Sequence, residues 1–125
     1  MTLLEVQKTL QAELLTLNVD LSRDVSSACA SDLMSDVLAF HSPNTLILTG
    51  LTNQQTIRTV EIADAVGVVF VRGKRPENEI IEFALKKQIP LMTTNYCMYD
   101  ASGLLYAKGL SGVTEQVRNF HKRND

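Results

Sequence analysis

The sequence predicts a three-layer α/β fold, in which a mostly parallel sheet of about four or five strands lies between helices. Strand-like and helix-like segments alternate along the chain. The run VVFV at 68–71 is apolar at every position, which is typical of a strand buried on both faces. At 125 residues and 45% hydrophobic content, the chain can bury its own core. We therefore expect a single domain over residues 1–125.

The first third of the chain predicts a helix, a strand and a second helix. Thr2 and Glu5 have the spacing of a capping box, and apolar residues then recur at steps of three and four to about residue 17. A loop over 18–24 precedes a weakly strand-like segment at 25–31. Ser31 or Asp32 is expected to cap the next helix, over 32–40.

The rest of the chain continues the alternation. LILT at 46–49 predicts a buried strand, and the next helix is expected to begin at the capping pair Thr52–Gln55 and to stop at Gly67. After the strand at 68–71, Pro76 suits the first turn of a helix. Further segments predict a strand at 89–94, a helix at 96–106, and a last short helix or tail at 111–124.

Polar and cationic residues follow the carboxyl ends of four predicted strands. In open parallel sheets, ligands bind outside these strand ends, and the helices that begin there present free N–H groups to an anion. We therefore predict a site for an anionic small molecule. Its candidate residues are Ser31, Asp32, Gly50, Thr52, Asn53, Arg72, Lys74, Thr94 and Asn95. The alternative is that these residues only cap helices and form turns.

The segment RGKRPE at 72–77 raises the question of a phosphate-binding loop. A P-loop has four residues between its glycines and a Ser or Thr after its lysine. Gly67 and Gly73 have five residues between them, Gly67 precedes the strand, and Arg75 follows Lys74. This segment is therefore not a P-loop. Two interpretations remain open, a looser anion site formed by Arg72, Lys74 and Arg75, or a solvated turn.

Composition and charge exclude several classes of function. The net charge of −2 argues against general nucleic-acid binding, which needs a positive field. No apolar run approaches the ~18 residues of a membrane span. The N-terminus is charged and amphipathic, unlike a signal peptide. We expect a cytoplasmic protein that does not bind membranes.

Residues able to support catalysis or metal binding are sparse. Cys29 and Cys97 are not in a CxxC pair and are expected to be buried free thiols. Neither His41 nor His121 has a nucleophile at a recognisable spacing. A carboxylate pair, Asp32 and Asp36, is expected to share a helix face, where helix capping explains it better than chemistry. We therefore predict no catalytic residue, metal or cofactor.

The organisation resembles the DRTGG-domain family, small α/β modules related to the N-terminal domain of HPr kinase/phosphorylase. The resemblance covers about residues 20–110 and rests on SRDVSSACASDLMSDVLAF, LILTGLTNQQTIRTVEIAD and VVFVRGKRPENEIIEFALKKQIPLMTT. In that family the strand ending in Thr-Gly typically continues with a second glycine, then Asp and Arg. Here Leu51, Thr52 and Asn53 follow Gly50, so the charged pair of the namesake motif is missing.

The resemblance implies a regulatory or ligand-sensing module that is not an enzyme. Such modules are often attached to CBS or acyltransferase-type domains and are commonly dimers, so we expect a homodimer formed through apolar helix faces. Some stand-alone members look associated with anaerobic iron-hydrogenase systems. This implies an alternative function, an accessory protein that docks on a larger, redox-type enzyme complex without a small-molecule ligand.

Overall fold

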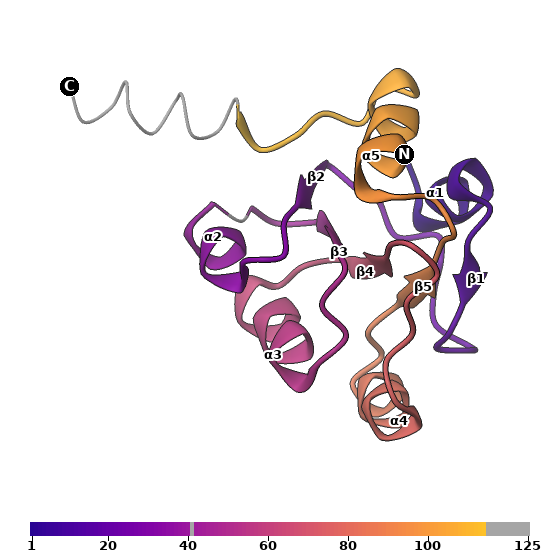
Figure 1. Ribbon diagram of the computed structural model, residues 1–125, viewed down its shortest axis with the longest axis vertical. Coiled ribbons are helices and arrows are strands. Elements are labelled where there is room, and N and C mark those ends of the chain that lie inside the picture. Colours follow the sequence, from indigo (N-terminus) through magenta and orange to yellow (C-terminus); the bar gives the residue numbers. More distant parts are fainter. Residues whose placement is uncertain (41, 115–125) are drawn as a thin grey trace.

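The computed structural model describes residues 1–40 and 42–114. Within these residues, ten elements follow one another (Figure 1). They are α1 (Leu3–Leu10), β1 (Glu13–Leu14), β2 (Ser27–Ala30), α2 (Met34–Ala39), β3 (Thr45–Thr49), α3 (Gln54–Ala63), β4 (Gly67–Phe70), α4 (Asn78–Lys86), β5 (Leu91–Thr93) and α5 (Met98–Ala107). The predicted terminal helix or tail lies largely outside the described residues.

One five-stranded sheet organises the molecule, in the order β1-β5-β4-β3-β2. Strands β2, β3, β4 and β5 are parallel neighbours, and only the short edge strand β1 runs antiparallel, against β5. The predicted mostly parallel sheet is therefore confirmed. The carboxyl ends of β2 to β5 all lie at one edge of the sheet, and the loops that follow them meet there.

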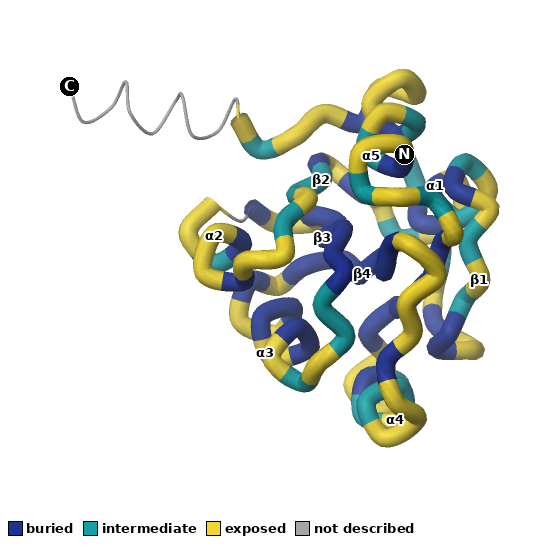
Figure 2. Tube along the Cα trace, viewed as in Figure 1, coloured by how far each residue is buried: buried dark blue, intermediate teal, exposed yellow. Residues whose placement is uncertain are grey.

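Helices cover both faces of the sheet (Figure 1). The helices that connect β2 to β5, namely α2, α3 and α4, lie together on one face. Apolar residues of these helices, such as Val37, Ile57 and Ala84, form a core with the strands on that side. On the other face α1 and α5 pack together and contribute Leu10 and Leu105 to a second core. Strands β3, β4 and β5 are buried between the two layers, whereas the edge strands β1 and β2 are partly exposed (Figure 2).

The first helix is shorter than its apolar pattern predicts. The capping box of Thr2 and Glu5 is present, but the helix ends at Leu10 because Gln11 adopts a left-handed conformation with φ of 48°. The chain then turns back, and Glu13 and Leu14 pair with β5 instead of extending the helix. The leucines that follow Leu10 at helical spacing are therefore compatible with a helix face and equally with an edge strand.

The second and third helices also begin or end at other residues than predicted. Neither Ser31 nor Asp32 caps α2, because Leu33 is its N-cap and makes no side-chain cap bond. Asn53, rather than Thr52, caps α3. That helix ends at Ala63, where Asp64 is left-handed with φ of 52°.

Gly67 does not stop a helix but begins β4. A Cβ atom at this position would lie only 3.0 Å from the carbonyl oxygen of Pro90. The glycine is therefore needed for the close approach of two chain segments.

None of the helices within the described ranges is long and apolar enough to cross a membrane.

Candidate functional site

Three loops that follow β2, β3 and β4 bring Asp32, Gly50 and Arg72 together, and we call these residues the Gly50 cluster. The Asp32 Oδ1 accepts hydrogen bonds from the Gly50 N–H at 2.6 Å and from the Thr49 hydroxyl at 3.0 Å. A Cβ atom on Gly50 would lie 2.6 Å from the Arg72 Nη2 and 3.5 Å from the Asp32 Oδ1. A carboxylate and a guanidinium therefore both lie against the glycine backbone.

Asp32 is held in its ionised form. The hydrogen bond from the Gly50 N–H has the largest effect and lowers the pKa of this carboxyl. Burial opposes it, and the Thr49 hydroxyl and the charges of Arg72 and Lys74 each lower the pKa by less. The Gly50 N–H, which we expected to face a ligand, is thus already occupied by an anion of the protein.

The turn that carries Arg72 has an unusual backbone. Arg72 and Gly73 have φ values of 60° and 68°, and the Lys74 N–H donates to the Val71 carbonyl at 3.2 Å. These are the positive φ values of a type I′ turn, in which an arginine costs about 1–2 kcal/mol relative to glycine. Strained residues of this kind persist where the surrounding structure fixes them and often belong to functional sites.

Two backbone hydrogen bonds fix this turn to the segment after β5. The Arg72 N–H donates to the Tyr96 carbonyl at 2.8 Å, and the Gly73 N–H donates to the Thr94 carbonyl at 2.7 Å. The Thr93 hydroxyl also donates to the Lys74 carbonyl at 2.7 Å. The RGK segment is therefore a turn with a fixed backbone, and it holds the Arg72 side chain towards Gly50.

The cations of this turn differ in their partners. Arg75 forms an ion pair with Glu13 of β1, so it serves to anchor the edge strand. The other ion pair in the described part of the chain joins Lys87 to Glu61, away from this turn in the sequence. Among the described residues Arg72 and Lys74 form no ion pair, and their exposed side chains lie at the sheet edge, where both charges act on Asp32.

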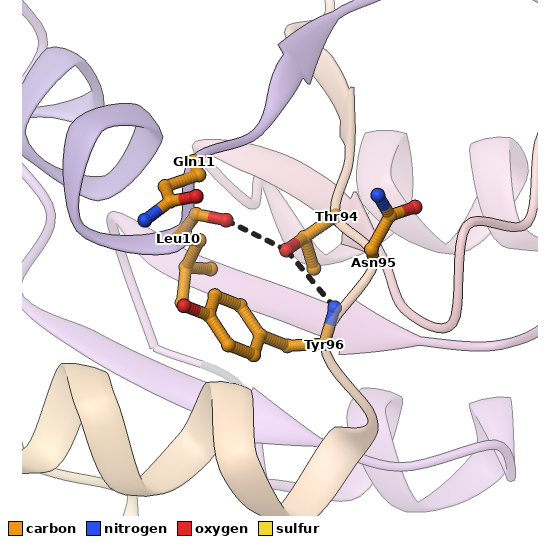
Figure 3. Close-up of a pocket in the computed structure, with 5 residues that line it drawn as sticks. All are labelled: Leu10, Gln11, Thr94, Asn95 and Tyr96. Atoms are coloured by element: carbon orange, nitrogen blue, oxygen red, sulfur yellow. Dashed lines mark hydrogen bonds between the residues drawn. The ribbon is translucent and has the colours of Figure 1, made fainter.

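A pocket of about 360 Å³ lies next to the turn, and we call it the Tyr96 pocket. Leu10 and Gln11 at the end of α1 line one side, and Thr94, Asn95 and Tyr96 after β5 line the other (Figure 3). The Thr94 hydroxyl donates to the Leu10 carbonyl at 2.7 Å and joins the two sides. The Tyr96 side chain extends towards α1 (Figure 3).

Most of the other predicted ligand residues have local structural roles. The Ser31 hydroxyl accepts from the Leu33 N–H at 3.0 Å, and the Asn53 Oδ1 accepts from the Thr56 N–H at 3.3 Å. Thr94 is buried and bonded to α1. Within the described residues, no hydrogen bond links Thr52 or Asn53 to the Gly50 cluster.

Gln11 and Tyr96 line this pocket but were not among the residues predicted from the sequence. Tyr96 directly follows the predicted Thr94 and Asn95, so its position after a strand was a usable signal. Gln11 gave none, because the apolar pattern placed it inside a helix. Its left-handed backbone is what brings it to the pocket.

The remaining candidates for chemistry do not come together. Asp32 precedes α2, so it does not share a helix face with Asp36, and the prediction of such a pair is wrong. His41 and His121 lie outside the described residues. Cys97 is exposed and Cys29 is half-buried, contrary to the expectation of buried thiols. Among described residues, no three His, Cys, Asp or Glu side chains are grouped to hold a metal.

A solved structure of similar fold exists. It is the crystal structure of the CBS and DRTGG domains of the regulatory region of Clostridium perfringens pyrophosphatase, complexed with its activator, diadenosine tetraphosphate. The TM-score is 0.67 and the identity 24%, over 82% of this chain and 45% of that one. The chain thus has the fold found in this regulatory region and spans less than half of it. No family model matches the sequence, and no curated protein matches it.

Proposed function

We propose that the chain is a non-catalytic, DRTGG-like regulatory domain that binds an anionic small molecule at the Gly50 cluster. One observation carries the proposal. The guanidinium of Arg72 lies beside Gly50 on a backbone in the left-handed region and forms no ion pair among the described residues, although its charge acts on the nearby Asp32. The fixed backbone of the turn brings this cation to the sheet edge, where an exposed guanidinium can pair with an anion.

The structural neighbour supports the regulatory part of this proposal. The pyrophosphatase region is regulatory and was solved with a nucleotide activator. The pyrophosphatase region and this chain share a fold, and we propose ligand sensing and a DRTGG-like character for this chain. We propose that residues 1–125 form a single domain.

The geometry indicates how an anion would be held. Arg72 offers a planar set of donors that matches a phosphate, and Lys74 adds a second positive charge from the same turn. Asp32 saturates the Gly50 N–H and balances part of the charge when the site is empty. We expect each charge-assisted hydrogen bond to contribute about 1.5–3 kcal/mol.

Inorganic pyrophosphate tests the proposal, because it offers phosphate oxygens without a base. A ligand at 100 times its dissociation constant stabilises the protein by about 2.7 kcal/mol, which a thermal-shift assay detects readily. The decisive variant is Gly50→Ala. Its methyl group collides only with the flexible end of Arg72, so we expect the fold to remain intact while the guanidinium moves and the shift is lost.

Two further variants complete the test. Arg72→Gly removes the cation but suits a positive φ, so this variant should fold at least as well and also lose the shift. Lys86→Ala removes one positive charge from the far end of α4, and this variant should retain the thermal shift. A shift that survives in both Gly50→Ala and Arg72→Gly would place the anion elsewhere, and an unshifted wild-type protein would contradict anion sensing.

The alternative function, docking on a larger enzyme complex, is supported by α5. Tyr99 and Tyr106 of this helix are 89% and 72% exposed. Exposed aromatic residues on one helix are typical of a protein interface. A second copy of the chain on this surface would give the proposed homodimer, and a partner protein would give the accessory function.

A further inference from the structure

The Tyr96 pocket contains polar side chains that the fold does not use. Gln11 and Asn95 carry amides and Tyr96 carries a hydroxyl, and none of these groups forms a side-chain hydrogen bond within residues 1–40 and 42–114. By contrast, the Thr94 hydroxyl is fully engaged with the Leu10 carbonyl and the Tyr96 N–H. The pocket thus combines an occupied internal hydrogen bond with free donors and acceptors around it.

The lining of the pocket selects for a neutral, planar, polar group. None of its five residues is charged, so the pocket itself does not attract an anion. Leu10 and the Tyr96 ring provide apolar surface, and the amides can pair with adjacent donors and acceptors on the edge of a heterocycle. A volume of about 360 Å³ lies in the range of small-molecule sites.

The pocket and the Gly50 cluster are parts of one surface. A Cβ atom on Gly73 would lie 3.0 Å from the Asn95 Oδ1, so the pocket residue Asn95 touches the turn that carries Arg72. Gly50 follows β3 and Thr94 follows β5, with β4 between them. Two strand spacings amount to about 10 Å, a distance that a nucleoside diphosphate can span.

From this arrangement we infer that the ligand is a nucleotide, whose base lies in the Tyr96 pocket and whose phosphates lie at Arg72. The inference rests on the proposed function, since it assigns the second half of the same ligand. Pyrophosphate alone would fill only the charged half of the site. The base would add affinity through contact with the Tyr96 ring and through hydrogen bonds to Gln11 and Asn95.

Isothermal titration with inorganic pyrophosphate, ADP and GDP tests the inference on the full chain. We expect ADP or GDP to bind about 10-fold more tightly than pyrophosphate, because the stacking of a base on an aromatic ring has about that effect. Tyr96→Leu keeps an apolar side chain against the core but removes the ring. It should abolish the advantage of the nucleotide and leave pyrophosphate binding unchanged.

Two other variants show whether the loss belongs to the pocket. Gln11→Gly removes an amide at a left-handed position that glycine accepts, and it should reduce nucleotide affinity alone. Phe40→Leu changes an exposed aromatic residue at the carboxyl end of α2 and should change neither affinity.

The outcomes separate this inference from the proposed function. Equal affinities for pyrophosphate and both nucleotides would overturn the assignment of the base, and so would an equal loss of both in Tyr96→Leu. Anion sensing at Arg72 would survive either result. Failure of all three probes to bind at millimolar concentration would overturn both.

Discussion

At the scale of single residues, two opposite charges lie beside Gly50 in the Gly50 cluster. The residues that follow Gly50 in the sequence are uncharged. Gly50 is followed by Leu51, Thr52 and Asn53, so the Asp–Arg pair that the DRTGG resemblance leads one to expect is missing locally. Asp32 and Arg72 reach the same glycine from the neighbouring strands. A carboxylate and a guanidinium therefore lie at this site through the topology of the sheet rather than through a local motif.

The lowered pKa of Asp32 predicts an acid-sensitive contribution to stability. The folded protein stabilises the ionised form of Asp32. Its contribution to the free energy of unfolding is therefore complete above the ordinary aspartate pKa of about 3.9, and it is lost as the pH falls through the lower pKa that Asp32 has in the folded protein. We expect Asp32→Asn to cost about 1 kcal/mol at neutral pH, since solvent screens an exposed carboxylate, and almost nothing at the acid end of this window.

Urea unfolding of both proteins between pH 2 and 7 measures this difference. Asp36→Asn removes a carboxylate from the adjacent helix and serves as the charge-matched control. A cost for Asp32→Asn that stays the same across this pH range would show that the hydrogen bonds of residue 32, and not its charge, stabilise the loops.

At the scale of elements, the sequence predicted the alternation of strands and helices because burial on both sheet faces leaves a clear apolar signal. The strand at β4 and the parallel sheet followed from VVFV and its neighbours. Ends of helices were less predictable. Gln11 and Asp64 end α1 and α3 in left-handed conformations that glycine more often adopts, so the sequence carried no obvious stop there.

The candidate site could be predicted only in part for a related reason. The residues after each strand were identifiable, and Asp32, Gly50 and Arg72 do meet. Their contacts depend on the strand order and on the positive φ of Arg72, neither of which the sequence displays. Gln11 comes from the first helix, and only its packing against the end of β5 makes it part of a pocket.

The exposed face of α5 leads us to expect that the chain associates with a second copy of itself. Tyr99, Gly103 and Tyr106 follow at steps of four and three and so share one face, and a Cβ atom on Gly103 would meet nothing within 4 Å. Asp100 is the only charged residue of this helix. A two-fold contact brings the same face of both copies together, and the small Gly103 between two rings allows close approach.

Light scattering at micromolar concentration measures the association. We expect the wild-type chain to have twice its mass of 13.9 kDa and Tyr106→Arg to return it to the monomer. Ile62→Arg introduces the same charge at an exposed apolar residue of α3 and should leave the dimer intact. A monomeric wild-type protein would leave the α5 face to a different partner.

At the scale of the whole molecule, two cores share a single sheet. Leu46, Leu48 and Val69 face the α1 and α5 layer, while Ile47, Val68 and Phe70 face the layer of α2, α3 and α4. Adjacent residues of one strand thus belong to different cores, as the alternation of side chains along a strand requires. Neither core can be lost without removing the support of the other, so we expect one cooperative unfolding transition.

The tyrosines allow this cooperativity to be measured from one side. The chain has no tryptophan, and its three tyrosines, Tyr96, Tyr99 and Tyr106, all lie in or just before α5. Ile57→Ala creates a cavity in the opposite core, where Ile57 is completely buried. The expected cost is about 2–5 kcal/mol, or on the order of 10 °C in melting temperature. Because the sheet couples the two layers, tyrosine fluorescence should shift by the same amount as far-UV circular dichroism. Val6→Ala, in the core beside α5, should likewise shift both signals together.

If Ile57→Ala instead lowered only part of the dichroism transition while the fluorescence transition stayed at the wild-type temperature, the two layers would unfold separately. The Gly50 cluster and the Tyr96 pocket would then belong to different unfolding units, because the loops of the cluster lead to the α2–α4 layer while the pocket lies beside α1 and α5.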